Sequence, residues 1–325
     1  MMGLALQLYM PERVLVLSTG GTIASTAGEN GASPTKAGEQ LVEAVPELDD
    51  RAEVEHLAQR PSPDMDFEVL ERLRDRAADH DAGVVVTHGT DTMAESAYYV
   101  DLVRDWDVPV VFTGAQRRPD QLGSNGPANI LDAVSVAEEP AVRSAGGVYV
   151  CLNGEVHAVR DAVKAHTWRP DTFESPGKGP VGAVAPDGFE RYRELGSDSV
   201  TLPDAERPSV DVPIVTTAIG VDRAQVDRAV DAGCDGLILQ TTGLGNAPES
   251  VADAVGDAIE AGVPVVVTSR CHAGGVAAVY GGGGGYTLEQ NGAVLGGDFS
   301  APKARIKLLV ALAADAPVAD AFADD

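Results

Sequence analysis

Short runs of apolar residues alternate along the first half of the chain with longer segments whose apolar positions recur at the spacing of a helix. The runs are bounded by Gly and Pro, a pattern typical of parallel strands connected by helices. The pattern predicts strands at 14–17, 83–87, 108–113 and 147–152, and helices at 66–78, 92–104 and 128–137. It therefore predicts an α/β fold.

A second alternating series begins at Pro213. It predicts strands at 214–218, 237–240 and 263–268, helices that begin at Asp222 and Ser250, and a last helix at 301–313. Between the two series, residues 196–212 are rich in Ser, Asp and Pro and read as a linker. We expect two domains, each with a largely parallel sheet flanked by helices: a larger N-terminal catalytic domain at 1–195 and a smaller C-terminal domain at 213–325. The glycine run at 281–285 predicts a mobile surface loop.

Composition narrows the class of protein. The 325 residues are 44% hydrophobic and 23% charged, as in ordinary globular proteins. The net charge of -26 argues against a basic face that binds nucleic acid or an anionic membrane. The acidic excess is spread along the chain and the basic residues are nearly all arginine, which favours a protein adapted to a high-salt cytoplasm. The alternative is a merely acidic soluble protein.

The cysteines and the N-terminus indicate where the protein resides. Cys151, Cys234 and Cys271 are odd in number and widely separated, so neither a disulfide framework nor a zinc site is expected. The start of the chain lacks the features of a signal peptide, and no apolar run approaches the ~20 residues that cross a bilayer. The expected location is the cytoplasm, and no metal is expected.

Two polar segments follow predicted strands, at the sheet edge where ligands bind in open α/β folds. The first, STGGTIA at 18–24, lacks the nucleotide fingerprints, and its alternative reading is a tight turn with Thr22 as a cap or turn residue. The second, THGTDTM at 87–93, opens a helix. Thr92 and Glu95 there have the spacing of a capping box, and His88 fits a packed strand-end histidine. Thr90 and Asp91 have no such structural explanation.

Several sequence strings together resemble the L-asparaginase family of threonine-dependent amidohydrolases. They are TGGTIA at 19–24, THGTDTM at 87–93, TGAQRRP at 113–119, SNGPANILDAV at 124–134 and the C-terminal KARIKLLVAL at 303–312. The likeness extends over about 13–315, and the first two strings in this order are highly specific. It implies a two-domain α/β homodimer or homotetramer that hydrolyses L-asparagine to L-aspartate and ammonia, with weaker activity on glutamine and no cofactor.

The same resemblance implies roles for individual residues. By motif matching, Thr22 corresponds to the nucleophile, and Thr90, Asp91 and Lys164, the last within RDAVKAHT, correspond to the second catalytic group. Ser62 in PSPDM matches a serine that holds the substrate α-carboxylate, with a turn serine as the alternative. Ala115 matches a position whose backbone carbonyl and neighbouring amides face the reacting amide.

The chemistry fits these residue types. A threonine hydroxyl is a weak nucleophile and needs a base or relay, and an acyl-enzyme divides amide cleavage into two easier steps. Burial would let Lys164 shuttle a proton, whereas Asp91 beside it favours the charged lysine. Asp91 would also attract a substrate ammonium, and the amides of a glycine-rich turn can stabilise an oxyanion. Which group deprotonates Thr22 stays open.

The chain departs from the family pattern in two places. The segment 25–40 has no aromatic residue where the family usually places a tyrosine. Its Gly and Pro predict a mobile lid rather than a helix or strand, and we expect one of its hydroxyls, on Thr26, Ser33 or Thr35, or a water held by them, to take over the relay. The segments 243–248 and after Arg270 offer no clear match to an asparagine and a glutamate that some members supply from a neighbouring subunit.

Two other functions compete. One is the amide-cleaving subunit of a tRNA-dependent amidotransferase, for which an additional N-terminal domain is expected, whereas 18 residues precede Thr19. The other is a catalytically silent amino-acid-binding protein of the same fold. A nucleotide-binding Rossmann protein is least favoured, since no phosphate fingerprint is present.

Overall fold

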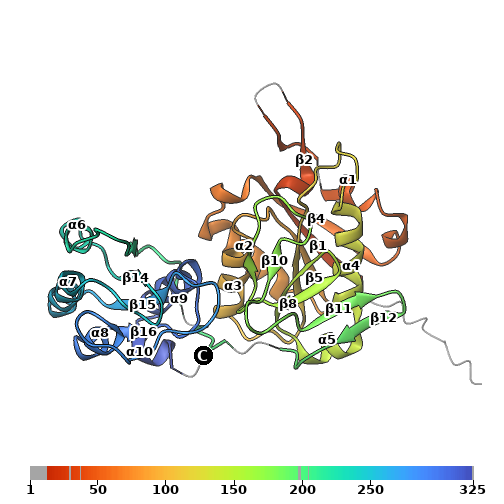
Figure 1. Cartoon of the computed structure of the whole chain (residues 1–325). Coiled ribbons are helices and arrows are strands. Elements are labelled where there is room, and N and C mark those ends of the chain that lie inside the picture. The colour runs from red at the N-terminus through yellow and green to blue at the C-terminus, as the bar shows by residue number, and fades with distance from the viewer. Residues whose placement is uncertain (1–12, 29–30, 37, 197–198, 204, 324–325) are drawn as a thin grey trace, which may run out of the picture.

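An eight-stranded sheet forms the centre of the N-terminal part of the chain (Figure 1). The computed structural model describes residues 13–28, 31–36, 38–196, 199–203 and 205–323. Five strands are parallel, in the order β4 (Ala52–Arg60), β1 (Val14–Gly20), β5 (Val84–Thr87), β6 (Val110–Thr113) and β7 (Val148–Leu152). Three antiparallel strands extend the sheet beyond β7: β8 (Glu155–Ala158), β11 (Gly182–Ala185) and β12 (Gly188–Arg191). The sheet is therefore mixed, and four of its five parallel strands, β1, β5, β6 and β7, are the ones that the sequence predicts.

Helices cover both faces of this sheet, which explains why its central strands are apolar throughout. Leu15 and Leu17 point to one face, under α2 (Phe67–Ala78) and α3 (Met93–Leu102). Val14 and Val16 point to the other, under α1 (Gly38–Val42) and α4 (Gly126–Glu138), with α5 (Pro140–Ala145) next in the chain. Because successive side chains of a strand point to opposite faces, one apolar run contributes to the hydrophobic cores on both sides of the sheet.

The C-terminal part has a smaller sheet of four parallel strands. They are β13 (Ile214–Thr216), β14 (Leu237–Thr241), β15 (Val265–Ser269) and β16 (Val294–Leu295), in that order. The helices are α6 (Ala224–Asp231), α7 (Glu249–Glu260), α8 (Gly285–Gln290), α9 (Ala301–Ala313) and α10 (Val318–Ala321). The expectation of an α/β chain with a larger N-terminal and a smaller C-terminal domain is confirmed.

Helix α9 joins the two parts. It packs on one face of the smaller sheet, against Ile238 and Val266, and its other side lies along α3 of the larger part (Figure 1). One continuous apolar cluster therefore runs from the larger sheet through α3 and α9 to the smaller sheet.

The connection between β12 and β13 has no helix or strand among its described residues. It is nevertheless packed against the larger part: the Tyr149 hydroxyl accepts a hydrogen bond from the Gly196 amide at 2.8 Å, and the Leu202 amide donates to the Leu102 carbonyl at 2.6 Å. Val212, next to the start of β13, is fully buried. The segment expected to be a linker thus follows a fixed course where the structure describes it.

Strand β4 was not predicted, and its sequence explains why. The run AEVEHLAQR carries charged residues at alternate positions and lacks the apolar character of the central strands. It lies at the edge of the sheet and pairs only with β1 among the described strands. The outer side of such an edge strand can therefore hold polar side chains. Edge strands of this kind are poorly marked by hydrophobicity.

The expectation of a mobile surface loop at 281–285 is wrong for its second half. Gly283, Gly284 and Gly285 are buried, and Gly285 is the first residue of α8. A Cβ atom on Gly284 would lie 2.3 Å from the Tyr280 carbonyl oxygen, and one on Gly285 the same distance from that of Ala277. The glycines are needed for close backbone packing rather than for mobility. No described helix is long and apolar enough to cross a bilayer.

Candidate active site

The turns that follow β1 and β5 meet at the carboxyl end of the larger sheet. The two strands are parallel neighbours, so both chains leave the sheet at the same edge. Gly21 has a φ of 82°, and a Cβ atom there would lie 2.3 Å from the Gly89 Cα atom. Only glycine permits this approach, which explains the glycines of both motifs.

A cavity of about 280 Å³ opens where these turns meet. Three of the sequence-predicted residues line it: Thr22, Ser62 and Asp91. Four further polar residues of its wall were not predicted from the sequence: Ser25, Gln116, Arg118 and Gln121. The last three follow β6, within the string TGAQRRP or two residues after it, so their position after a neighbouring strand end was the available signal.

Thr22 begins a short 3-10 helix, Thr22–Ala24, directly after the glycine pair. Its side chain is half-buried, whereas Ile23 and Ala24 behind it are buried. The Ser25 hydroxyl donates to the Gly21 carbonyl at 2.8 Å and so closes the turn from the other side. The turn therefore holds Thr22 at the cavity wall.

Ser62 is buried at the start of another short helix, Ser62–Asp64. The Thr92 hydroxyl donates to the Ser62 carbonyl at 2.7 Å, which attaches this helix to the start of α3. The expected capping box is therefore wrong, because the Thr92 hydroxyl is bound to Ser62 and makes no side-chain cap. Glu95 is partly buried instead, and burial raises the pKa of its carboxyl.

The structure brings Lys164 to Thr90 and Asp91. The Lys164 Nζ atom donates to the Thr90 Oγ1 atom at 2.9 Å and to an Asp91 carboxylate oxygen at 2.6 Å. Since the ammonium has only donors, Thr90 accepts from it and points its own proton to Gln116 Oε1 at 3.4 Å. The Lys164 side chain is 15% exposed and that of Asp91 63% exposed, so only the carboxylate is readily open to a ligand.

His88 is a structural residue, as the sequence indicated. Its ring is fully buried, and its Nδ1 atom lies 2.7 Å from the Gly89 carbonyl oxygen. Burial lowers the pKa of His88 to about 4, so the ring is neutral at physiological pH. A neutral ring whose Nδ1 donates to that carbonyl supports the turn and leaves the charge of the cavity to Asp91 and Arg118.

Ala115 does not line the cavity. Its side chain is fully buried in the core beneath, close to Ile23 and Gly126. Its neighbour Gln116 takes the place at the wall, and the amides of Gln116 and Arg117 both donate to the side-chain oxygen of Asn125, at 3.2 and 3.0 Å. Ala115 thus anchors a turn whose next residue, Gln116, lines the cavity.

The segment 25–40 is not free of regular structure, so that expectation is wrong. It forms a short antiparallel hairpin, β2 (Ser25–Thr26) with β3 (Ser33–Pro34), which projects from the larger part (Figure 1), and α1 follows. The hydroxyls of Thr26 and Thr35 bond each other at 2.7 Å. The described hairpin residues that line the cavity are Ser25, Ala32 and Pro34. The three hydroxyls expected to serve Thr22 therefore lie outside the described wall.

The hairpin is attached to the rim of the cavity through Asp120. One carboxylate oxygen accepts from the Ala27 amide and the other from the Arg118 side chain, both at 2.9 Å. These bonds lower the pKa of Asp120, with the Ala27 amide as the larger cause. The hairpin and Arg118 thus share one anchor.

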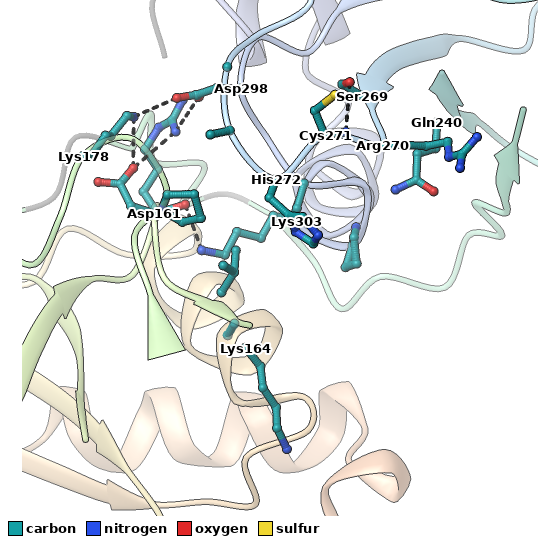
Figure 2. A pocket seen from close by; sticks show the side chains of 18 of the residues that line it. Asp161, Lys164, Lys178, Gln240, Ser269, Arg270, Cys271, His272, Asp298 and Lys303 are labelled. Carbon is teal, nitrogen blue, oxygen red and sulfur yellow. Dashed lines mark hydrogen bonds and ion pairs between the residues drawn. The ribbon is translucent and has the colours of Figure 1, made fainter. Parts of the chain in front are cut away.

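A second cavity, of about 310 Å³, lies between the two sheets (Figure 2). Asp91 and Lys164 belong to its wall, together with Gln240, Arg270 and Cys271 of the smaller part. Asp91 therefore faces both cavities. Among the described residues, no group of three His, Cys, Asp or Glu side chains is placed to hold a metal ion.

Comparisons with known proteins agree with this geometry. The family model described as "Asparaginase, N-terminal" matches residues 13–195, and the model "Glutaminase/Asparaginase C-terminal domain" matches residues 211–321. An L-asparaginase of Bacillus licheniformis is 35% identical over 94% of this chain and 96% of its own length.

Two further matches bear on the function. A glutamyl-tRNA(Gln) amidotransferase component of Methanothermobacter thermautotrophicus is 34% identical over 79% of this chain and 62% of its own length. The crystal structure of a probable cytoplasmic L-asparaginase from Campylobacter jejuni has a TM-score of 0.84 and 28% identity, over 97% of this chain and 100% of that one.

Proposed function

Because the chain belongs to the asparaginase family of amidohydrolases, we propose that it hydrolyses the side-chain amide of free L-asparagine to L-aspartate and ammonia. The observation that carries the proposal is the shared cavity: a threonine hydroxyl, a buried serine and a carboxylate, on Thr22, Ser62 and Asp91, line one space at the edge of the sheet. The ion-paired Lys164 adjoins it through Asp91.

In this proposal Thr22 is the nucleophile. Its oxygen attacks the amide carbon, its proton leaves with the amide nitrogen as ammonia, and an ester of Thr22 remains. Water then cleaves the ester, which releases the acid and restores the hydroxyl. The amides at the glycine-rich turns are suited to stabilise the negative oxygen that forms in each step.

Thr90 and Lys164 form the second catalytic group. The contact of the Lys164 ammonium with the Thr90 hydroxyl favours deprotonation of that hydroxyl when a proton has to move. In the resting site Lys164 is bonded to Asp91, and a substrate ammonium that binds Asp91 would compete for that carboxylate. Binding of the correct substrate would therefore release the lysine for proton transfer.

Asp91 and Ser62 recognise the amino-acid end of the substrate. The exposed carboxylate pairs with the α-ammonium, and the serine hydroxyl donates to the α-carboxylate. Arg118 in the same wall adds a positive charge for the carboxylate side. We place this activity in the cytoplasm of a salt-adapted cell, in a homodimer or homotetramer.

The test is ammonia release by the purified protein from asparagine, glutamine and two blocked asparagines, one acetylated at nitrogen and one amidated at carbon. We expect turnover of asparagine above that of glutamine and none of the blocked forms. No ammonia from asparagine would overturn the proposal. Binding without turnover would then point to a catalytically silent protein, and turnover only with a partner protein to an amidotransferase component.

A further inference from the structure

Charged side chains from both parts of the chain meet where α9 reaches the larger sheet (Figure 2). We call them the junction cluster: Arg160, Asp161, Lys178, Arg193, Asp298 and Lys303. Four of them come from the larger part, and Asp298 and Lys303 come from the smaller part. The cluster surrounds the turn at 159–162, which connects β8 to the short strand β9 (Val163–Lys164).

Lys303 of α9 binds the backbone of that turn directly. Its side chain is 2% exposed, and its Nζ atom donates to the carbonyl oxygens of Val159 and Arg160, the latter at 2.8 Å. Its ammonium also lies 5.6 Å from the centre of the Tyr98 ring. Burial lowers the pKa of Lys303 to about 7. Helix α9 of the smaller part thus supplies hydrogen-bond donors to the turn at 159–162 of the larger part.

Ion pairs hold the same turn from its other sides. Asp161 accepts from Arg193 at 2.7 Å and from Lys178 at 3.0 Å. Burial raises the pKa of Asp161, but the bonds from Arg193 and Lys178 outweigh it, so the pKa is lowered and the carboxylate stays charged. Asp298 binds Arg160 at 2.8 Å and Lys178 at 3.1 Å, which ties the turn to the smaller part again.

Lys164 follows this turn after two residues. The amides of Asp161 and Ala162 both donate to the Ala158 carbonyl at 3.0 Å, and Ala162 is fully buried, so the turn is tight and fixed. Figure 2 shows the Lys164 side chain pointing away from the junction cluster. Its ammonium instead reaches Thr90 and Asp91. The cluster therefore acts on Lys164 through the backbone and not by direct contact.

From this arrangement we infer that Lys303 is a positioning residue: from the smaller sheet, it fixes the turn at 159–162 and thereby sets the ammonium of Lys164 against Thr90 and Asp91. The inference rests on the proposed function of Lys164. An apolar side chain would fill the same space without the cost of burying an ammonium. It would leave the carbonyls of Val159 and Arg160 without their donor and the turn free to shift.

Lys307 provides a matched control. It lies one helical turn after Lys303 on α9 and is also fully buried. Its ammonium contacts the rings of Phe299 and Phe322, at 4.9 and 5.2 Å from their centres. A change at Lys307 therefore removes a buried ammonium from the same helix but leaves the bonds from Lys303 to the turn in place.

The experiment compares Lys303→Met, Lys307→Met and Lys303→Arg in steady-state hydrolysis of asparagine, with folding checked by thermal unfolding. A displacement of about 1 Å in a catalytic group costs up to roughly a hundredfold in rate, so we expect kcat of Lys303→Met to fall about tenfold or more while KM changes less than about threefold. Lys303→Arg, which keeps donors, should recover most of kcat. Lys307→Met should retain kcat within about twofold at a similar loss of stability.

Unchanged kcat in Lys303→Met, or an equal loss in Lys307→Met, would overturn the inference. If Lys303→Met does not fold, Lys178→Met loosens the same turn from a side chain that is 36% exposed, and the same fall in kcat is expected. If the wild-type protein releases no ammonia, the proposed function fails instead. The crystal structure of Lys303→Met then decides: the inference requires that Lys164 loses its bonds to Thr90 and Asp91, and retained bonds overturn it.

Discussion

The cavity at Thr22 and the junction cluster differ in how their carboxylates are paired and buried. In the junction cluster, both carboxylates are bound by at least two cationic side chains, and Asp161 is almost completely buried. In the cavity, the one cationic partner of Asp91 among the described residues is Lys164, and the Asp91 side chain is exposed. Carboxylates held by several cations fix a structure, whereas an exposed carboxylate with one cationic partner is available to a ligand.

The two regions also differ in how they are assembled. The cavity forms at the ends of adjacent parallel strands, β1, β5 and β6, so each contributor is a contiguous motif after a strand. The junction cluster brings together positions from 160 to 303, from turns and a helix of two different sheets. We expect replacements in the cavity to change turnover, and replacements in the cluster to act on turnover only through position.

The largest effects should come from Thr22→Val and Lys164→Met. Loss of a nucleophile or of a proton-transfer group typically removes several orders of magnitude in rate, so we expect kcat to fall by at least about a thousandfold in each. Both changes are nearly isosteric, and the midpoint of thermal unfolding should change little. Near-normal turnover by either folded variant would show that the residue has no part in the mechanism. It would also contradict the expected difference between the cavity and the junction cluster.

The strand-end motifs were visible in the sequence because the same residues serve fold and site. Gly21 and Gly89 allow the two turns to touch, and Thr22 and Asp91 stand directly beside them. The central strands of both sheets and most helices could be predicted because their apolar positions follow the period of a strand or helix. The outer strands β4, β8, β11, β12 and β16 could not.

Contacts between segments far apart in the sequence could not be predicted. Thr92 looks like a helix cap, but it bonds to the Ser62 carbonyl of another loop, 30 residues earlier. Lys303 looks like a surface residue of a C-terminal helix, but it is buried against Val159. Neither pairing leaves a periodic or local signal in the sequence.

A second, smaller effect concerns the recognition of the substrate by Asp91. Replacement of Asp91 by Asn removes the charge that pairs with the α-ammonium. A hydrogen bond to a charged group contributes roughly 1.5–3 kcal/mol, so kcat/KM should fall about tenfold to a hundredfold. Asp64→Asn is the matched control, because Asp64 is exposed beside the cavity but does not line it. Cleavage of asparagine inside a peptide as fast as the free amino acid would show that Asp91 and Ser62 do not recognise the α-groups.

The hydroxyls of Ser25 and Ser33 on the hairpin are expected to differ in their effect on the cavity wall. Ser25 is buried and closes the Thr22 turn through its bond to the Gly21 carbonyl, whereas Ser33 is exposed on the same hairpin. Without the Ser25 bond, the Gly21 carbonyl keeps only the hydrogen bond from the Ala24 amide among the described residues. Ser25→Ala should therefore lower kcat about fivefold and stability by about 0.5–1.5 kcal/mol. Ser33→Ala, alone or with Thr26→Ala and Thr35→Ala, should leave kcat within about threefold. A large loss in the triple variant would restore the hairpin hydroxyls as the relay.

The smallest effect per residue comes from the surface charges. Fifty acidic residues against 24 basic ones repel one another, and salt screens exposed charges far more than buried pairs. The midpoint of thermal unfolding should rise by about 5 °C or more between low and molar potassium chloride. Sucrose at matched osmolality is the control. A flat or falling response would leave the acidic composition unexplained by adaptation to salt.

The most direct test of the central claim is to find the covalent intermediate. The protein is mixed with asparagine, quenched in acid within the first turnovers, digested and analysed by mass spectrometry. We expect an aspartyl ester on the peptide that contains Thr22, and no such adduct in Thr22→Val. An ester on the peptide that contains Thr90, or continued turnover by Thr22→Val, would contradict it.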